Sequence, residues 1–199
     1  FIRAFEMGES LENFSSSMSA GNKTAENEKY LRQIWEVPSL TINSKWFLYA
    51  KGGQYRKWYG NIDVIIDWSD KAKQRYKENP SACMIKEDYW FKLGFTYTDL
   101  TSKSFSCRLL RNDMLFDMSG PGVLFENELL FYAMGLYNSC VSKKYFETLN
   151  SSFHFKLNDL NRIPIIFSET HKPKIDSLVE QNIALSRTDW DSFETSWDF

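Results

Sequence analysis

The chain has 199 residues, a net charge of −2 and an aromatic content of 17%. This composition excludes a disordered protein, because burial of so much apolar surface offsets the entropy lost on folding. No apolar run approaches the roughly 18 residues of a membrane helix, and the first residue, Phe1, precedes neither a basic segment nor a cleavage site, so we expect a cytoplasmic fragment of a longer protein without a signal peptide.

The first half of the chain is predicted to alternate strands and helices. Residues 13–22 are rich in Ser and Gly and predict a loop, and Thr24 can cap a helix over 25–36. Strands are predicted over 45–49, 55–59 and 62–67, with a tight turn at Gly52-Gly53. A polar helix is expected from Ser69 to Glu78, ended by Asn79-Pro80.

The second half changes from strands to helices. Three strands are predicted over 94–98, 104–110 and 114–118. An apolar stripe then predicts two consecutive helices that meet near Asn138-Ser139; it consists of Leu130, Met134, Tyr137, Val141 and Tyr145. Residues 163–167 predict a short apolar strand or extended segment, for which Pro164 favours an edge position. Residues 171–186 predict a helix. The aromatic tail, with Trp190, Phe193 and Trp197, is expected to pack on a surface.

These elements predict a mixed α/β (α+β) fold, in which an irregular twisted sheet packs against helices. We expect one domain over 1–168, of which 1–24 is partly loop. Residues 169–199 are expected to form a C-terminal helix followed by an aromatic and acidic docking tail.

Catalytic and metal-binding patterns are mostly missing from the sequence. The three cysteines have no C-x-x-C spacing, which argues against a disulfide framework or a zinc site. Neither histidine lies near a nucleophile motif. The segment Asp117-Met-Ser-Gly-Pro-Gly122 follows a predicted strand and precedes a predicted helix, as a nucleotide-binding loop does, but a simple turn is the favoured interpretation. We therefore predict no catalytic residue and no metal ligand.

The strongest functional signal is a basic and aromatic window over 45–61, which contains four basic residues, six aromatic residues and no acid. Basic side chains neutralise phosphates, Gln, Asn and Arg read base edges, aromatic rings stack on bases, and glycine allows close approach of the backbone. The alternative, a solvated hairpin with core aromatics, stays open from spacing alone. A hydroxyl-rich, basic segment over 96–108 could also meet phosphates, although Ser and Thr clusters usually form turns.

The window also carries a resemblance. The run Lys51-Gly-Gly-Gln-Tyr-Arg-Lys-Trp-Tyr-Gly-Asn61 resembles the C-terminal half of the large adenine-specific DNA methyltransferase of BREX phage-defence systems, as does the closing segment 189–199. A more generic match over 131–185 resembles the target-recognition domains of type I and type IIG restriction–modification proteins, in which the helix over about 171–186 would be the spacer helix.

The resemblance implies a DNA target-recognition domain. Its candidate DNA-binding residues are Lys45, Lys51, Gly52, Gly53, Gln54, Arg56, Lys57, Trp58, Tyr59, Asn61, Ser102, Lys103 and Arg108. The parent enzyme would use S-adenosylmethionine to methylate a flipped adenine, but this chain lacks the cofactor-binding loop and the Asn-Pro-Pro-aromatic motif, so we expect no cofactor and no methylation here. The implied partners are double-stranded DNA, the catalytic domain of the same chain and other defence subunits.

Three alternatives belong to other classes. A protein-interaction module of the same defence complex is the main one, because the aromatics and the acidic tail could form an interface. A carbohydrate-binding module is weakened by the absence of a secretion signal. A stand-alone enzyme is the least favoured, since no catalytic set is assembled in the sequence.

Overall fold

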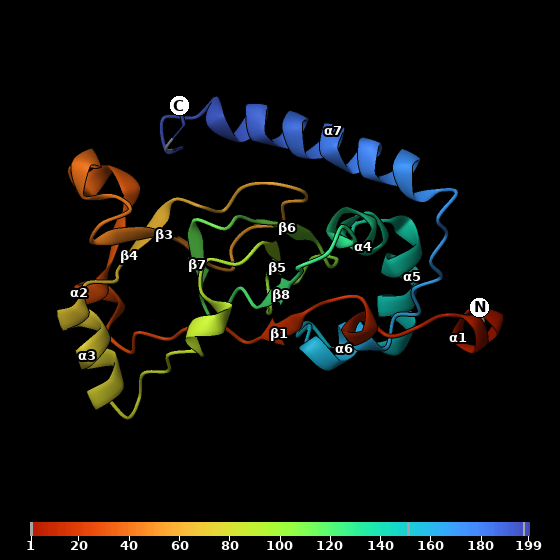
Figure 1. Ribbon diagram of the computed structural model, residues 1–199, viewed down its shortest axis with the longest axis horizontal. Helices are drawn as coiled ribbons and strands as arrows, with labels where there is room; N and C mark the ends of the chain where they lie inside the picture. Colours follow the sequence, from red (N-terminus) through yellow and green to blue (C-terminus); the bar gives the residue numbers. More distant parts are fainter. Residues whose placement is uncertain (1, 151, 197) are drawn as a thin grey trace.

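The computed structural model describes residues 2–150, 152–196 and 198–199. Two four-stranded sheets lie in the middle of the molecule, with helices at both ends and one long helix across the top in Figure 1. The predicted mixed α/β class is confirmed. No helix in the described part combines the length and the apolar content that a membrane span requires.

The first sheet has the strand order β2-β4-β3-β7. Its strands are β2 (Leu31–Gln33), β4 (Val64–Asp67), β3 (Trp46–Ala50) and β7 (Met114–Phe116). Pairing is antiparallel except between β3 and β7, where Tyr49 lies opposite Leu115. The apolar sequences of β3 and β4 suit a buried pleated surface. After Ala50 the chain leaves β3, and it returns to the first sheet at Val64, where β4 begins.

Helix α3 (Asp70–Glu78) packs beside the first sheet, near the short helix α2 (Asn27–Tyr30). Ser69 caps α3, because its side-chain oxygen accepts a hydrogen bond from the backbone N–H of Ala72. Tyr76 is buried against Tyr30 and Trp68. The opposite face of α3 therefore presents its charged side chains to solvent.

The second sheet is entirely antiparallel, with the order β1-β8-β5-β6. Its strands are β1 (Ser17–Ser19), β8 (Gly122–Leu124), β5 (Gly94–Tyr97) and β6 (Cys107–Leu110). One face packs on the helical end of the molecule through Phe95 and Cys107. On the other face, Thr96 and Arg108 are paired in register and point toward the first sheet.

The remaining helices build the largest core. They are α1 (Ile2–Met7), α4 (Leu130–Tyr137), α5 (Cys140–Leu149), α6 (Leu157–Asn161) and α7 (Lys172–Asp191). Phe105, Tyr137 and Phe146 pack ring against ring inside this core. Gly135 lets α7 approach α4 closely, since a Cβ there would lie 3.0 Å from Ile175. The predicted meeting point of two helices is confirmed, because Ser139 caps α5 directly after α4.

Three predicted elements differ from the structure. The helix over 25–36 is reduced to α2, followed by β2 and a 3-10 turn over Ile34–Glu36, because Leu31 and Gln33 pair with β4. The loop over 13–22 contains β1. The predicted strand over 55–59 is irregular, because Trp58, Gly60 and Asn61 have positive φ angles. Trp197 of the predicted docking tail lies outside the described residues.

Candidate nucleic-acid interface

Residues 51–61 form an irregular segment, here called the strap, that connects β3 to β4 and passes beneath α7 in Figure 1. The backbone N–H of Trp58 donates to Cys107 (2.9 Å), and Leu109 N–H donates to the carbonyl of Trp58 (2.8 Å). The strap therefore adds one residue to the free edge of β6. This is all that remains of the predicted strand at 55–59.

The basic side chains of the strap contact other parts of this chain. Arg56 forms an ion pair with Asp189 of α7 (2.8 Å) and lies over the ring of Trp190. Lys57 Nζ donates to the carbonyl of Asn138, 2.6 Å away, at the end of α4. Lys51 lies 3.6 Å from Asp117. In this conformation, three cations predicted to contact DNA hold the two sheets and the helices together.

The aromatic residues of the strap differ in their exposure to solvent. Tyr59 is buried and its hydroxyl accepts a hydrogen bond from Arg111 (2.9 Å), while Arg187 of α7 lies over its ring. Desolvation raises the pKa of Tyr59, although the two neighbouring arginines oppose the shift. Trp58 is half-buried and Tyr55 exposed. Tyr59 thus belongs to the core, as the alternative interpretation of the window expected.

Gly52 of the strap has no side chain, and this allows its backbone to contact another part of the chain. A Cβ on Gly52 would collide with the carbonyl oxygen of Ser119, and one on Gly120 would lie 2.9 Å from the carbonyl carbon of Lys51. The strap and the turn after β7 are therefore in backbone contact. Asn61 closes the strap by donating from Nδ2 to the carbonyl of Gln54 (3.0 Å).

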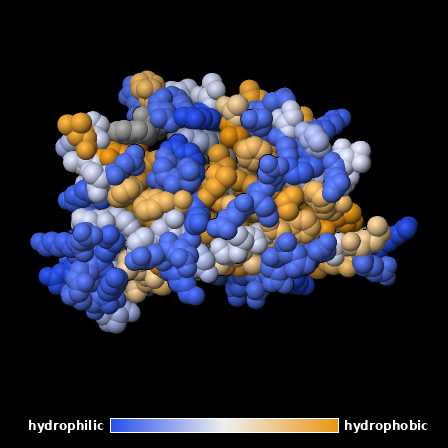
Figure 2. Space-filling view, in the orientation of Figure 1, coloured by the Kyte–Doolittle hydropathy of each residue, from blue (hydrophilic) through white to orange (hydrophobic). Residues whose placement is uncertain are grey.

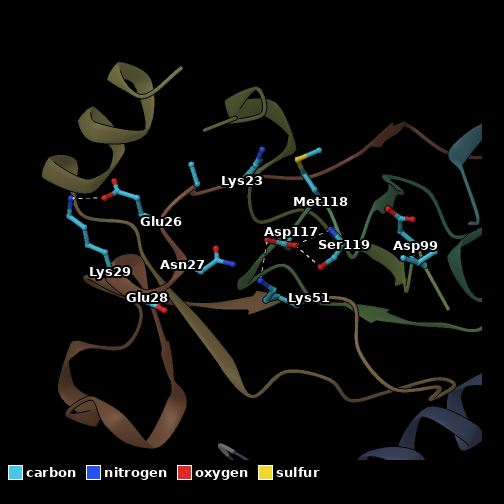
Figure 3. A pocket seen from close by; sticks show the side chains of 12 residues that line it. Lys23, Glu26, Asn27, Glu28, Lys29, Lys51, Asp99, Asp117, Met118 and Ser119 are labelled. Carbon is cyan, nitrogen blue, oxygen red and sulfur yellow. Dashed lines mark hydrogen bonds and ion pairs between the residues drawn. The ribbon is translucent and has the colours of Figure 1, made fainter. Parts of the chain in front are cut away.

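Asp117 organises this turn, as Figure 3 shows. Its carboxylate accepts hydrogen bonds from the Tyr49 hydroxyl (3.0 Å) and from the N–H (2.9 Å) and hydroxyl (2.6 Å) of Ser119. Burial, followed by the charge of Asp117, raises the pKa of Tyr49 well above its usual value. The turn leads into β8 rather than directly into a helix, so the resemblance to a nucleotide-binding loop does not extend to the structure.

A hollow of about 950 Å³ opens beside this turn. Lys23, Lys29 and Lys51 line it together with carboxylates that include Asp99 and Asp117. Asp99 also lies 2.6 Å from His154 Nε2. Among the residues that the structure describes, no group of His, Cys, Asp or Glu could hold a metal ion.

The other predicted site residues lie on the outside. Lys45, Gly53, Gln54, Ser102 and Lys103 are exposed. Lys45 lies 3.5 Å from Asp67 and lines a hollow of about 670 Å³ whose other basic residues are Lys29, Lys71 and Arg75. Ser102 and Lys103 line a second one of about 390 Å³ with Lys143. Phosphate contacts are available at these two places without disturbing the core.

Arg108 is the least accessible of the predicted residues. It is 0% exposed, and Nη1 lies 3.4 Å from the Thr98 hydroxyl. Nε and Nη2 have no hydrogen-bond partner among the described residues. Desolvation lowers the pKa of Arg108 to about 10; Cys107 opposes this shift and the charge of Arg56 adds to it.

The sequence did not reveal the partners of the strap. Asn138, Asp117 and Asp189 receive its three cations, but each lies at least 66 positions away along the chain. Of these, Asn138 carried the clearest signal, because the sequence already predicted that two helices meet there. That signal predicted only where one helix ends and the next begins. It gave no information about the contact between Lys57 and the carbonyl of Asn138.

The amino-acid sequence of the chain is similar to segments of known proteins. The chain is 32% identical over 202 aligned residues to the adenine-specific methyltransferase PglX of Lacticaseibacillus casei (strain Zhang), which covers 92% of this chain. It is 34% identical over 163 residues to the adenine-specific methyltransferase BrxX of Escherichia coli O9:H4 (strain HS), which covers 79% of this chain. Most of this chain is similar to a segment of two adenine-specific methyltransferases. It spans 17% and 13% of the lengths of PglX and BrxX. No protein-family model matches the chain.

The strap's role in the structure can be tested at Arg56. We expect Arg56→Ala to lower the free energy of unfolding by only about 0.2–1 kcal/mol, because Asp189 is more than half exposed. The main effect is local: amides near Trp190 should exchange hydrogen faster, since that end of α7 loses its anchor. Hydrogen–deuterium exchange measures this, with Arg75→Ala as the control for an exposed arginine. Unchanged exchange near Trp190 would show that the ion pair does not hold the helix.

Proposed function

We propose that this chain is the sequence-specific DNA recognition region of an adenine-specific DNA methyltransferase from a phage-defence system. The observation that carries the proposal is the match to PglX, which extends over 92% of this chain and only 17% of the enzyme. This segment of a methylating enzyme lacks the Asn-Pro-Pro-aromatic motif and the cofactor-binding loop of the catalytic part, so it fits target recognition better than catalysis. The BREX-type C-terminal recognition region inferred from residues 51–61 is part of the same proposal.

The exposed cations are the proposed phosphate contacts. Hydrophilic side chains gather over α3 at the lower left of Figure 2, where Lys71 and Arg75 line one hollow with Lys45. The loop with Ser102 and Lys103 supplies a hydroxyl and a cation at a second place. Such contacts position a duplex without reading its sequence. Gln54 is an exposed residue of the strap and is the proposed base-reading side chain, since an amide can bond two atoms of adenine.

The members of the predicted set that contact other parts of the chain have a supporting role in this proposal. Arg56, Lys57 and Tyr59 attach the later part of the strap to α7, to the end of α4 and to Arg111, while Gln54 in its earlier part is exposed. Methylation itself, and S-adenosylmethionine, would belong to other parts of the parent enzyme. Double-stranded DNA, that catalytic part and other defence subunits are the proposed partners. The boundary between a recognition domain over 1–168 and a C-terminal helix and tail over 169–199 is part of the same proposal.

A second candidate is a protein-interaction module. A hollow of about 450 Å³ between α4, α5 and α7 is mostly apolar and includes Val141, Ile166 and Leu178 in its lining. Figure 2 shows apolar side chains gathered toward this end of the molecule. Apolar surface of this kind is common at protein interfaces.

A gel shift with duplex DNA at low and moderate salt distinguishes the two functions. DNA recognition predicts binding by the chain that weakens steeply as salt rises, because each neutralised phosphate releases counterions. A duplex that carries the target sequence should then be retained at salt concentrations that release an unrelated duplex. Absence of a shift at low salt, together with capture of a defence subunit, would favour the interaction module instead.

A further inference from the structure

The strap covers a buried cation that has no anionic partner. Arg108 is 0% exposed, and two of its three guanidinium nitrogens lack a hydrogen-bond partner in the described part of the chain. A guanidinium has five N–H donors, and a charge buried without a partner is strongly unfavourable. The contact to the Thr98 hydroxyl, at 3.4 Å, compensates little of this.

The surroundings of Arg108 add positive charge. Arg56 lies close enough to disfavour the charged form of Arg108, and its own carboxylate partner, Asp189, belongs to α7. The strap therefore holds a second cation, Arg56, close to the buried guanidinium, and an anion placed between the two would relieve both the repulsion and the missing hydrogen bonds.

The start of the strap lies beside Arg108, because Gly53 bonds the same Thr98 hydroxyl that Arg108 contacts. The carbonyl of Gly53 accepts a hydrogen bond from Thr98 (3.3 Å), and the carbonyl of Gln54 accepts one from Asn61 (3.0 Å). Gly53 and Gln54 are both exposed, so water can compete for these bonds. Trp58 and Asn61 have φ angles of 71° and 58°, which store backbone strain in the same segment.

We propose that residues 52–54 are a movable cover over a phosphate-binding site, in which Arg108 binds a phosphate group together with Arg56 and the Thr98 hydroxyl. The planar guanidinium matches two phosphate oxygens at once, and it is less strongly hydrated than an ammonium group. The phosphate group can come from inorganic phosphate or from a nucleic-acid backbone. The site itself does not depend on the proposed DNA recognition; its supply by DNA rests on that function.

Thermal unfolding in inorganic phosphate tests the site. Compared with chloride at equal ionic strength, phosphate should raise the midpoint of the wild-type chain by about 2–4 °C more than that of Arg108→Met. In chloride, Arg108→Met should unfold at or above the wild-type midpoint, because it removes an unpaired buried charge. Arg3→Met, at an exposed arginine of α1, is the matched control and should respond to phosphate as the wild type does.

The control matters because phosphate also stabilises proteins generally by exclusion from their surface. An equal response of all three proteins would overturn the proposal, as would a wild-type chain that phosphate does not stabilise. If Arg108→Met does not fold, hydrogen–deuterium exchange of the wild type decides. Exchange at residues 52–54 should change in phosphate relative to chloride, and unchanged exchange there overturns the movable cover.

A short duplex identifies the source of the phosphate. If DNA supplies it, the slope of log K against log salt should be about 0.9 smaller for Arg108→Met than for the wild type. Equal slopes would overturn the DNA source, and a phosphate response in the thermal experiment would then support free phosphate. Failure of both proteins to bind duplex would overturn the proposed function, while the inorganic phosphate experiment would still decide the site.

Discussion

Replacement of Lys45, Lys71 and Lys103 by Gln should reduce the slope of log K against log salt for duplex binding by about 2.7, or roughly 0.9 for each phosphate that is no longer neutralised. All three side chains are exposed, and the last two make no ion pair within the described residues. Their removal therefore weakens binding without disturbing the core. Fluorescence anisotropy with a labelled duplex, across a series of salt concentrations, measures the slope.

The matched control for this charge change is the triple variant of Lys92, Lys144 and Lys172. Each of these lysines already contacts a carboxylate of this chain, namely Glu126, Glu147 and Asp176. The control removes the same net charge, so it tests whether any loss of three positive charges weakens binding. A slope equal to that of the wild type in the first variant would contradict the proposed DNA-facing surface. Single variants then assign each phosphate to its lysine.

Asp117→Ala should lower the free energy of unfolding by about 2–4 kcal/mol, because it removes a buried acceptor of charge-assisted hydrogen bonds. The Tyr49 hydroxyl would retain only its hydrogen bond to the carbonyl of Asn22, and Ser119 would lose both of its bonds to the carboxylate. Lys51 would also lose its ion pair. Urea unfolding measures the change as a lower midpoint with an unaltered slope.

Asp117→Asn and Asp113→Ala are the comparisons for this prediction. The asparagine keeps one carbonyl oxygen and should fall between the alanine variant and the wild type. Asp113 forms an ion pair with Arg111 but is partly exposed, so its removal should cost only about 0.2–1 kcal/mol. Similar losses for the two alanine variants would show that Asp117 does not organise the junction of the strap and the turn.

The elements that the sequence predicted well are those determined by local patterns. β4 follows from apolar alternation, β3 from a continuous apolar run, and α3 from a polar helical segment that Asn79-Pro80 ends. The break between α4 and α5 follows from the helical stripe. The helix over 25–36 failed because β2 depends on pairing with β4, more than 30 positions away. Local propensity gives no information about such a partner.

The candidate site was predictable in composition but not in orientation. The sequence indicated that basic and aromatic residues gather in 45–61, and the structure divides them between β3 and the strap. Whether a cation points to solvent or into the molecule depends on distant partners: Asp189 is 133 positions from Arg56, and Asn138 is 81 positions from Lys57. This explains why Lys45 and Gln54 remain available on the surface while Arg56 and Lys57 do not.

Helix α7 couples two ends of the molecule. Its first half packs against α4 at Gly135, and its last turn holds the strap through Asp189 and Trp190. A helix of 20 residues is about 30 Å long and behaves as a stiff rod. A slide of α7 by one turn along α4 would therefore pull the anchor away from the strap. A displacement at the helical end would in this way alter the packing of the strap about 30 Å away.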